Sequence, residues 1–198
     1  IPSTFRIARQ LLDRIENSKT GEVLVKSCHV EIPKEQLQYA DETARILGHQ
    51  IIEDYPFLEG VQPVTNDPKE AYLNRSWRPT VSYTGIDGIP SLDQAGNVLR
   101  PRTAIGLSIR LPPTADDEAV VAELKQIFET NPPYGAKVTF TCNKHAPGFY
   151  APPLENWLAD SVNTASKTLW GKPAAFESCG GSIPILNLLR EKFPQAQF

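Results

Sequence analysis

Apolar residues recur at intervals of three and four positions in several stretches of this chain, and that period predicts amphipathic helices. Ser3 is placed to cap the first helix, and Gly171 is placed to end the helix before the last. The last helix opens at Pro184, where the missing N–H of proline costs nothing. The predicted helices cover residues 3–16, 34–53, a segment that starts at the acidic residues 116–118 and stops at Asn131, residues 154–170 and the segment after residue 183.

The middle of the chain changes to a period of two, which predicts half-buried strands. The alternation is strictest over residues 104–111, which end at a Pro-Pro pair. Three strands are predicted, at residues 80–84, 104–111 and 138–142. A helix follows the second strand and presents one apolar stripe. The pattern therefore indicates a small, open antiparallel α+β sandwich with its helix on one face.

Other stretches carry weaker patterns. Residues 22–32 and 174–177 are expected to be extended. Residues 55–78 are rich in proline, acidic and polar residues, which is typical of a connecting segment at the surface, with a helical turn near residues 69–73.

Composition narrows the classes of function. The chain has 198 residues, of which 40% are hydrophobic and 22% charged, and its formal net charge is −3. This balance is ordinary for a globular protein and gives no reason to expect nucleic acid or an anionic membrane as a partner. Three cysteines without framework spacing favour free thiols, a reducing compartment and a cytoplasmic location. The chain contains no methionine and begins Ile-Pro-Ser, so we expect a piece of a longer protein.

The run Gly180-Gly181-Ser182 before Pro184 is the strongest candidate for a binding site. Glycines let the backbone approach a ligand closely, and a helix start offers unpaired N–H groups and the positive end of a dipole. These features suit a carboxylate or a phosphate. The alternative is an ordinary turn between a strand and a helix.

Other candidate sites are less complete. Cys142 and His145 have the spacing of metal ligands, but Cys142 alternates in phase with core residues and no second pair completes a tetrahedral site. Cys179, close to a helix start, is a candidate nucleophile with His145 as its base, or a small packing residue. Arg110 is out of phase with the apolar residues of its strand. It can hold a carboxylate from the opposite face of the sheet, or simply be solvated there.

Three runs of sequence together resemble the carnosinase-like branch of the dizinc metallopeptidases, peptidase family M20. They begin at Arg78, Asn97 and Gly180, and read RPTVSYTGIDG, then NVL through SIRLP, then GGSIP. The opening Ile-Pro-Ser also resembles the segment after a His-Ser-Gly stretch of that family. The resemblance covers essentially the whole chain.

The resemblance implies an α/β catalytic domain interrupted by a lid, or dimerisation, domain. The lid is a ferredoxin-like antiparallel sheet with helices on one face, expected at residues 55–148. Residues 1–54 and 149–198 are then flanking, largely helical segments of the catalytic domain. The resemblance also implies a homodimer through the lid. Two zinc ions in the parent enzyme would activate a water for attack on a peptide or amide carbonyl. The metal ligands and the glutamate base are expected outside these residues, so the fragment is expected to bind no catalytic zinc and to be inactive alone.

The resemblance also assigns substrate-binding residues. Gly180, Gly181 and Ser182 match the turn that receives the substrate's terminal carboxylate. Asn97 and Arg110 match a lid pair that binds a carboxylate, often in the site of the other subunit.

Two positions depart from the family. Thr84 stands where carnosinases carry a histidine that donates to the oxyanion, so Thr84 is left as a weaker candidate donor. Ser178 replaces an arginine found in many members. Both departures place the substrate preference in question.

The sequence thus favours part of a metal-dependent hydrolase of small peptides or amides with a free carboxylate. Two alternatives stay open: a non-catalytic protein that binds an anionic small molecule, and a cysteine hydrolase that uses Cys179.

Overall fold

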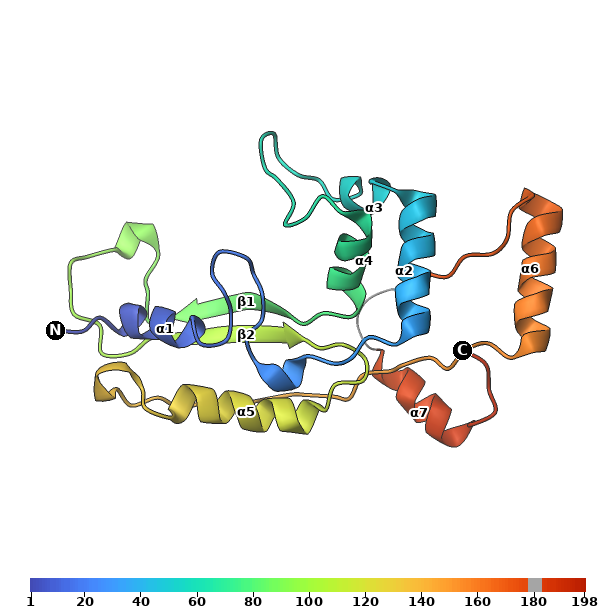
Figure 1. Cartoon of the computed structure of the whole chain (residues 1–198). Coiled ribbons are helices and arrows are strands. Elements are labelled where there is room, and N and C mark those ends of the chain that lie inside the picture. Colours follow the sequence, from blue (N-terminus) through green and yellow to red (C-terminus); the bar gives the residue numbers. More distant parts are fainter. Residues whose placement is uncertain (178–182) are drawn as a thin grey trace.

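The structure, a computed structural model, describes residues 1–177 and 183–198. Over those residues the protein is mixed α+β, with seven α-helices and a two-stranded antiparallel sheet (Figure 1). The strands are β1 (Thr80–Asp87) and β2 (Ala104–Arg110). The helices are α1 (Thr4–Leu12), α2 (Lys34–Leu47), α3 (Gln50–Glu53), α4 (Pro68–Ser76), α5 (Asp117–Glu129), α6 (Asn156–Trp170) and α7 (Pro184–Lys192).

The two strands pair where alternation predicted them, and a bulge extends the first. Tyr83 pairs with Leu107 and Gly85 pairs with Gly106, which leaves Thr84 as an extra residue in β1. The bulge shifts the phase of the strand, because one additional residue moves every later side chain to the other face. Ile86 therefore lies opposite Ile105, on the apolar face, and β1 continues to Asp87 instead of stopping at the glycine.

One face of the sheet is covered by α5 and by the N-terminal segment. The buried stripe of α5, predicted from its spacing, is Val120, Leu124 and Phe128. Asp116 caps this helix by accepting a hydrogen bond from the backbone N–H of Ala119, at 3.0 Å. The same hydrophobic cluster, the sheet cluster below, also includes Leu11, Ile15, Val23, Val25 and Cys28, with Val81, Leu107 and Ile109 partly buried against it.

A second cluster lies between α2, α3 and α4, which Figure 1 shows upright beside one end of the sheet. It includes Tyr72, Leu73 and Trp77, whose side chains are at most 3% exposed. The prediction that residues 55–78 form a surface connection is therefore wrong for the part that becomes α4. Asp67 starts this helix by accepting hydrogen bonds from the backbone N–H groups of Lys69 and Glu70, at 2.8 and 3.2 Å. The acidic and proline residues that suggested a loop are its N-terminal cap.

The predicted third strand does not form within the described residues. Val138 and Phe140 pack against the sheet cluster as their alternation indicated, but Cys142 is exposed. The backbone N–H of Phe140 donates to the carboxylate of Glu129, at 2.9 Å, so a side chain of α5 takes the place of a strand partner. Alternation therefore predicted the packing of Val138 and Phe140 correctly, but it was wrong about the core position of Cys142 and about the pairing of a third strand.

The two short extended segments also differ from the prediction. Residues 22–32 contain one isolated bridge, from Glu16 to Val23, and a 3-10 helix, Lys26–Cys28. Residues 174–177 form no strand.

Two predicted helices are shorter than their apolar periods. The first ends at Leu12, and Ser3 occupies its N-cap without a side-chain hydrogen bond. The second divides at Gly48, where the backbone leaves the helical region (φ 55°, ψ −135°) and α3 begins two residues later. Ile51 is nevertheless buried, so the interrupted helix still delivers its apolar residue to the α2–α4 cluster.

Helix α6 ends at Gly171 as predicted, in the left-handed region (φ 70°). Its predicted core face is wrong within this structure, since none of its described residues is buried. Figure 1 shows α6 standing apart from the other elements, and Trp157 and Trp170 are 67% and 73% exposed. An apolar stripe predicts that a helix packs against another apolar surface, but it does not identify that surface.

None of the helices that the structure describes is long and apolar enough to cross a membrane. The sheet cluster joins α1 to β1, β2 and α5, and thus includes residues on both sides of position 54. The division at residues 54 and 148 stays a prediction.

Candidate substrate-carboxylate site

The face of the sheet opposite the core is polar and carries two of the predicted site residues. Arg110 ends β2, pairs with Thr80 and is exposed on this face, as its phase predicted. The Thr84 hydroxyl lies on the same face, because a Cβ added at Gly106 would come within 3.0 Å of it. At about 3.3 Å per residue, Thr84 lies roughly 12 Å along the sheet from Arg110.

Asn97 lies far from Arg110 within one chain. It is exposed in the loop that joins β1 to β2, at the end of the sheet where Asp87 pairs with Ala104. Arg110 lies at the other end (Figure 1). A single copy of the chain does not bring the predicted lid pair together.

Gly180, Gly181 and Ser182, together with Ser178 and Cys179, lie outside the described residues. The helix that follows them begins at Pro184 as predicted, and Ile183 occupies its N-cap position without a side-chain hydrogen bond.

Contacts downstream of residues 178–182 place the start of α7 near the end of β2. The side-chain amide of Asn187 donates to the carbonyl oxygens of Pro147 and Gly148, at 3.2 and 2.8 Å. Gly148 lies directly against Pro113, since a Cβ there would come within 2.3 Å of the Pro113 carbonyl oxygen. Pro113 follows Arg110 by three residues. The polar sheet face at Arg110 and the amino end of α7 are thus at the same end of the sheet (Figure 1).

The segment around residue 150 is held in turn by the α2–α4 cluster. The Tyr150 hydroxyl donates to the Glu35 carboxylate, and its ring packs edge-on against Trp77 with 5.4 Å between centroids. Burial, followed by the hydrogen bond to Glu35, raises the pKa of Tyr150, so this hydroxyl keeps its proton. Arg190 of α7 donates to the Tyr150 carbonyl oxygen, at 2.9 Å. These contacts were missed from the sequence because their partners are more than 30 residues apart.

Upstream of residues 178–182 the chain is attached to α2 and α4. The Thr43 hydroxyl donates to the Phe176 carbonyl oxygen, at 3.1 Å, and the rings of Tyr39 and Phe176 lie 5.7 Å apart. Arg75 of α4 forms an ion pair with Glu177. The sequence offered little indication of this ion pair, because Arg75 lies in the segment 55–78 that was predicted to be a surface connection.

The residues considered as metal ligands form no such site within the described part of the chain. No group of three His, Cys, Asp or Glu side chains there is placed to hold an ion. His145 donates a hydrogen bond from Nδ1 to the Asp117 carboxylate, at 2.6 Å, and the Cys142 thiol donates to the Lys144 carbonyl oxygen. The His, Cys, Asp and Glu residues that the structure describes do not fit a zinc centre.

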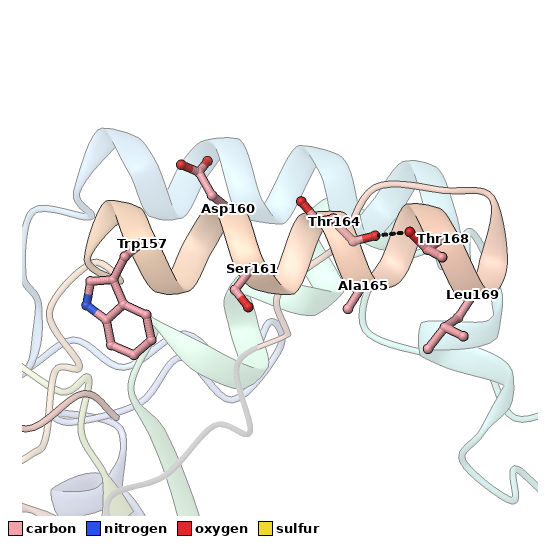
Figure 2. A pocket seen from close by; sticks show the side chains of 7 residues that line it. All are labelled: Trp157, Asp160, Ser161, Thr164, Ala165, Thr168 and Leu169. Carbon is pink, nitrogen blue, oxygen red and sulfur yellow. Dashed lines mark hydrogen bonds between the residues drawn. The ribbon is translucent and has the colours of Figure 1, made fainter.

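A shallow hollow runs along α6, and Figure 2 shows the side chains that line it. All of them belong to this one helix: Trp157, Asp160, Ser161, Thr164, Ala165, Thr168 and Leu169. Its only ionisable group is an aspartate, so it does not offer a positive charge to an anion. The candidate carboxylate site lies elsewhere, at the Arg110 end of the sheet.

Comparison with known proteins identifies the family of the chain. The family described as "Peptidase dimerisation domain" (M20_dimer) matches residues 2–136. A "Cysteinylglycine-S-conjugate dipeptidase" from Corynebacterium striatum is 25% identical over 156 residues, which are 73% of this chain and 32% of that protein. A "Cys-Gly metallodipeptidase dug1" from Schizosaccharomyces pombe is 30% identical over 124 residues, which are 60% of this chain and 25% of that protein.

Solved structures share the fold. Human carnosine dipeptidase 1 superposes with a TM-score of 0.68 at 19% identity, over 100% of this chain and 42% of the human chain. The di-peptidase Dug1p from Saccharomyces cerevisiae superposes with a TM-score of 0.63 at 16% identity, over 98% of this chain and 40% of that chain. The chain therefore spans less than half the length of the relatives it matches.

Proposed function

The chain belongs to the M20 peptidase dimerisation family, and from that premise we propose that it is the lid and substrate-carboxylate portion of a metal-dependent dipeptidase. The observation that carries the proposal is the family match over residues 2–136 together with two relatives named as dipeptidases. The relatives are metallopeptidases, and the metal centre of the parent enzyme is proposed to lie outside these 198 residues. The chain alone is then inactive.

The proposed substrates are small peptides or amides with a free carboxylate. Arg110 offers a fork of donors on an exposed sheet face, which matches the two oxygens of a carboxylate. The amino end of α7 lies at the same end of the molecule and favours negative charge through its dipole. We propose that the backbone of Gly180, Gly181 and Ser182 receives the carboxylate and that Arg110 assists. Thr84, along the same face, is proposed as a weak donor to the oxyanion.

The separation of Asn97 from Arg110 is compatible with a site shared between subunits. In the proposed homodimer, the loop that carries Asn97 reaches the partner's site while Arg110 serves its own, or the reverse. Free thiols at Cys28 and Cys142 support the proposed reducing, cytoplasmic location.

The test is hydrolysis by the full-length protein that contains this chain. We expect Cys-Gly to be cleaved with added zinc, and cleavage to be lost after chelation. Replacing the substrate carboxylate with an amide should lower kcat/KM by roughly tenfold or more, because a neutral amide cannot form the charge-assisted hydrogen bonds that Arg110 is proposed to donate.

A variant separates the role of Arg110 from a general loss of activity. Arg110→Ala should raise KM for Cys-Gly and leave the slow reaction of the amide substrate unchanged. Arg9→Ala, an exposed arginine of α1, is the matched control. Equal kcat/KM values for the acid and the amide would contradict the carboxylate site.

Because Thr84 stands where carnosinases carry a histidine, a second candidate function is a protein that binds an anionic ligand without cleaving it. That alternative is supported if Cys-Gly binds in a carboxylate-dependent way and no product forms at any metal concentration. A Cys179 hydrolase is supported only if alkylation of Cys179 abolishes turnover and chelation does not.

A further inference from the structure

We propose that Gly106 is a positioning residue for the oxyanion donor, because its missing side chain leaves the space in which the Thr84 hydroxyl lies. This role rests on the one proposed above for Thr84, and both residues belong to the hairpin of β1 and β2. Gly106 itself touches neither substrate nor metal in the proposed mechanism.

Thr84 owes its position to the bulge in β1. It is the extra residue between two cross-strand pairs, which are Tyr83 with Leu107 and Gly85 with Gly106. A bulged residue has no partner of its own in the facing strand, so the backbone on either side of it sets the direction of its side chain. Bulges are frequent next to active sites for this reason, because they redirect one side chain.

The bulge is anchored from the core face of the sheet. The Tyr83 hydroxyl donates to the carboxylate of Glu16 in the N-terminal segment, at 2.5 Å. Burial, and then Glu16 and the nearby Asp13, raise the pKa of Tyr83 to about 12, so this hydroxyl keeps its proton at neutral pH. The residue before Thr84 is therefore attached to the segment that covers the core, which limits movement of the bulge.

The Thr84 hydroxyl lies over Gly106 on the polar face. A Cβ added at Gly106 would come within 3.0 Å of the hydroxyl oxygen, which is closer than ordinary van der Waals contact. Gly85, the cross-strand partner, differs, because a Cβ there would meet no atom within 4 Å. Of these two facing glycines, only Gly106 provides space for the hydroxyl.

A side chain at position 106 should turn the hydroxyl and leave the fold almost unchanged. Threonine places its hydroxyl in one of three staggered positions about 120° apart, so an obstructed hydroxyl moves to a different direction. Thr84 is exposed, and its hydroxyl has no hydrogen-bond partner among the described residues, so the rotation costs little stability. The cost falls on catalysis, because an oxyanion donor is effective only when it points to the place where charge develops.

Steady-state kinetics of the full-length protein with Cys-Gly test this role. We expect Thr84→Ala to lower kcat by roughly tenfold and to keep KM within about twofold, because the donor acts on charge that develops in the transition state. Gly106→Ala should lower kcat by a similar factor. Gly85→Ala is the matched control and should keep kcat within about twofold, since it adds the same atom to the facing residue without meeting the hydroxyl.

A double variant separates positioning from a general disturbance of the sheet. Once the hydroxyl is removed, Gly106→Ala has no donor to turn, so Thr84→Ala/Gly106→Ala should be no slower than Thr84→Ala. A further loss of roughly tenfold in the double variant would mean that Gly106 acts on the strand itself, and it would overturn the proposal. Equal kcat values for Gly106→Ala and Gly85→Ala would overturn it as well.

Crystal structures of the full-length wild type and of the two glycine variants provide a second measurement that does not require turnover. Thr84 should occupy a different staggered position in Gly106→Ala only. An unchanged position there would overturn the positioning role even if activity fell. If the wild-type protein cleaves no Cys-Gly, the proposed function fails, and these structures still decide whether Gly106 directs the hydroxyl.

Discussion

At the scale of single residues, Arg14 joins the N-terminal segment to the end of a helix more than 100 positions away. Its guanidinium donates to the carbonyl oxygens of Ile127, Thr130 and Asn131, at 2.8, 2.8 and 2.7 Å. These carbonyl groups lie at or beyond the last turn of α5, where no N–H group of the helix is available to donate to them. One side chain therefore completes the C-terminal end of α5.

Arg14→Ala should destabilise the chain by about 1–2 kcal/mol, the usual effect of losing hydrogen bonds from a charged group. Chemical denaturation measures this value, and the exposed Arg9→Ala should change stability by no more than about 0.5 kcal/mol. Equal effects of the two variants would mean that the contacts of Arg14 add nothing to folding.

Glu123 attaches the 3-10 helix at Lys26–Cys28 to α5. Its carboxylate accepts the backbone N–H groups of Lys26 and Ser27, at 3.3 and 2.8 Å. The Ser27 hydroxyl beside the carboxylate, and then the backbone N–H groups of Ser27 and Lys26, lower the pKa of Glu123. A lowered pKa in the folded state adds stability above the unfolded pKa, and that stability disappears as the pH falls through the folded value.

The wild-type chain should therefore lose more stability than Glu123→Gln when the pH is lowered from 6 toward 3. We expect the difference to be about 0.5–1 kcal/mol, since solvent screens this group. Denaturation at several pH values measures it, with Glu42→Gln on the exposed face of α2 as the control. Parallel curves for wild type and Glu123→Gln would contradict the assignment.

At the scale of elements, the hairpin of β1 and β2 depends on a close approach at Gly88. The backbone there has φ 86°, and a Cβ would come within 2.3 Å of the Arg102 carbonyl oxygen. Both observations exclude a side chain, since the conformation is strained for other residues and backbone atoms cannot yield.

Gly88→Ala should destabilise the hairpin by roughly 2 kcal/mol or more, combining strain and overlap. Gly96→Ala in the same loop meets no atom within 4 Å and should be almost neutral. Thermal unfolding of the two variants measures the difference. Similar melting temperatures would show that the loop can move to accommodate the alanine side chain without loss of stability.

Elements were predictable where a local period and a local signal agreed. Asp116 capping α5 and Gly171 ending α6 are examples, because both act within a few residues of their helix. The strand predicted at residues 138–142 failed because pairing needs a distant partner, and Glu129 satisfied the Phe140 N–H instead. Only a helical turn near residues 69–73 was predicted for α4, because the burial of Tyr72 and Trp77 depends on α2, which the local composition does not reveal.

The candidate site was predictable to a similar degree. The phase of β2 was sufficient to place Arg110 on the polar face. The contacts that set residues 176 and 177 were not predictable, since Tyr39, Thr43 and Arg75 are separated from them by about 100 positions or more. A pattern over a few neighbouring residues does not indicate contacts between residues so far apart in the sequence.

At the scale of the whole molecule, the described sheet has only two strands, so each strand keeps an unpaired edge. Open edges favour pairing with another chain. A protein of the M20 peptidase dimerisation family is expected to use such an edge to form a homodimer.

Sedimentation velocity should show a species of twice the chain mass that gains population as concentration rises. Its formation should not depend strongly on salt, because backbone hydrogen bonds rather than charges join strand edges. A single species of monomer mass at high concentration would contradict dimerisation through the sheet edge.

The amino-acid sequence by itself determined the two strands, the apolar stripe of α5, the polar position of Arg110 and the helix that starts at Pro184. Each of these depends on residues within a turn or a strand length, where the period of the backbone is the dominant physical constraint. The tertiary structure decided the burial of α4, the extra residue at Thr84 that places Ile86 opposite Ile105, and the attachment of Glu177 to Arg75. Those outcomes depend on which distant surfaces meet, and packing free energy between remote segments is not encoded in any local pattern.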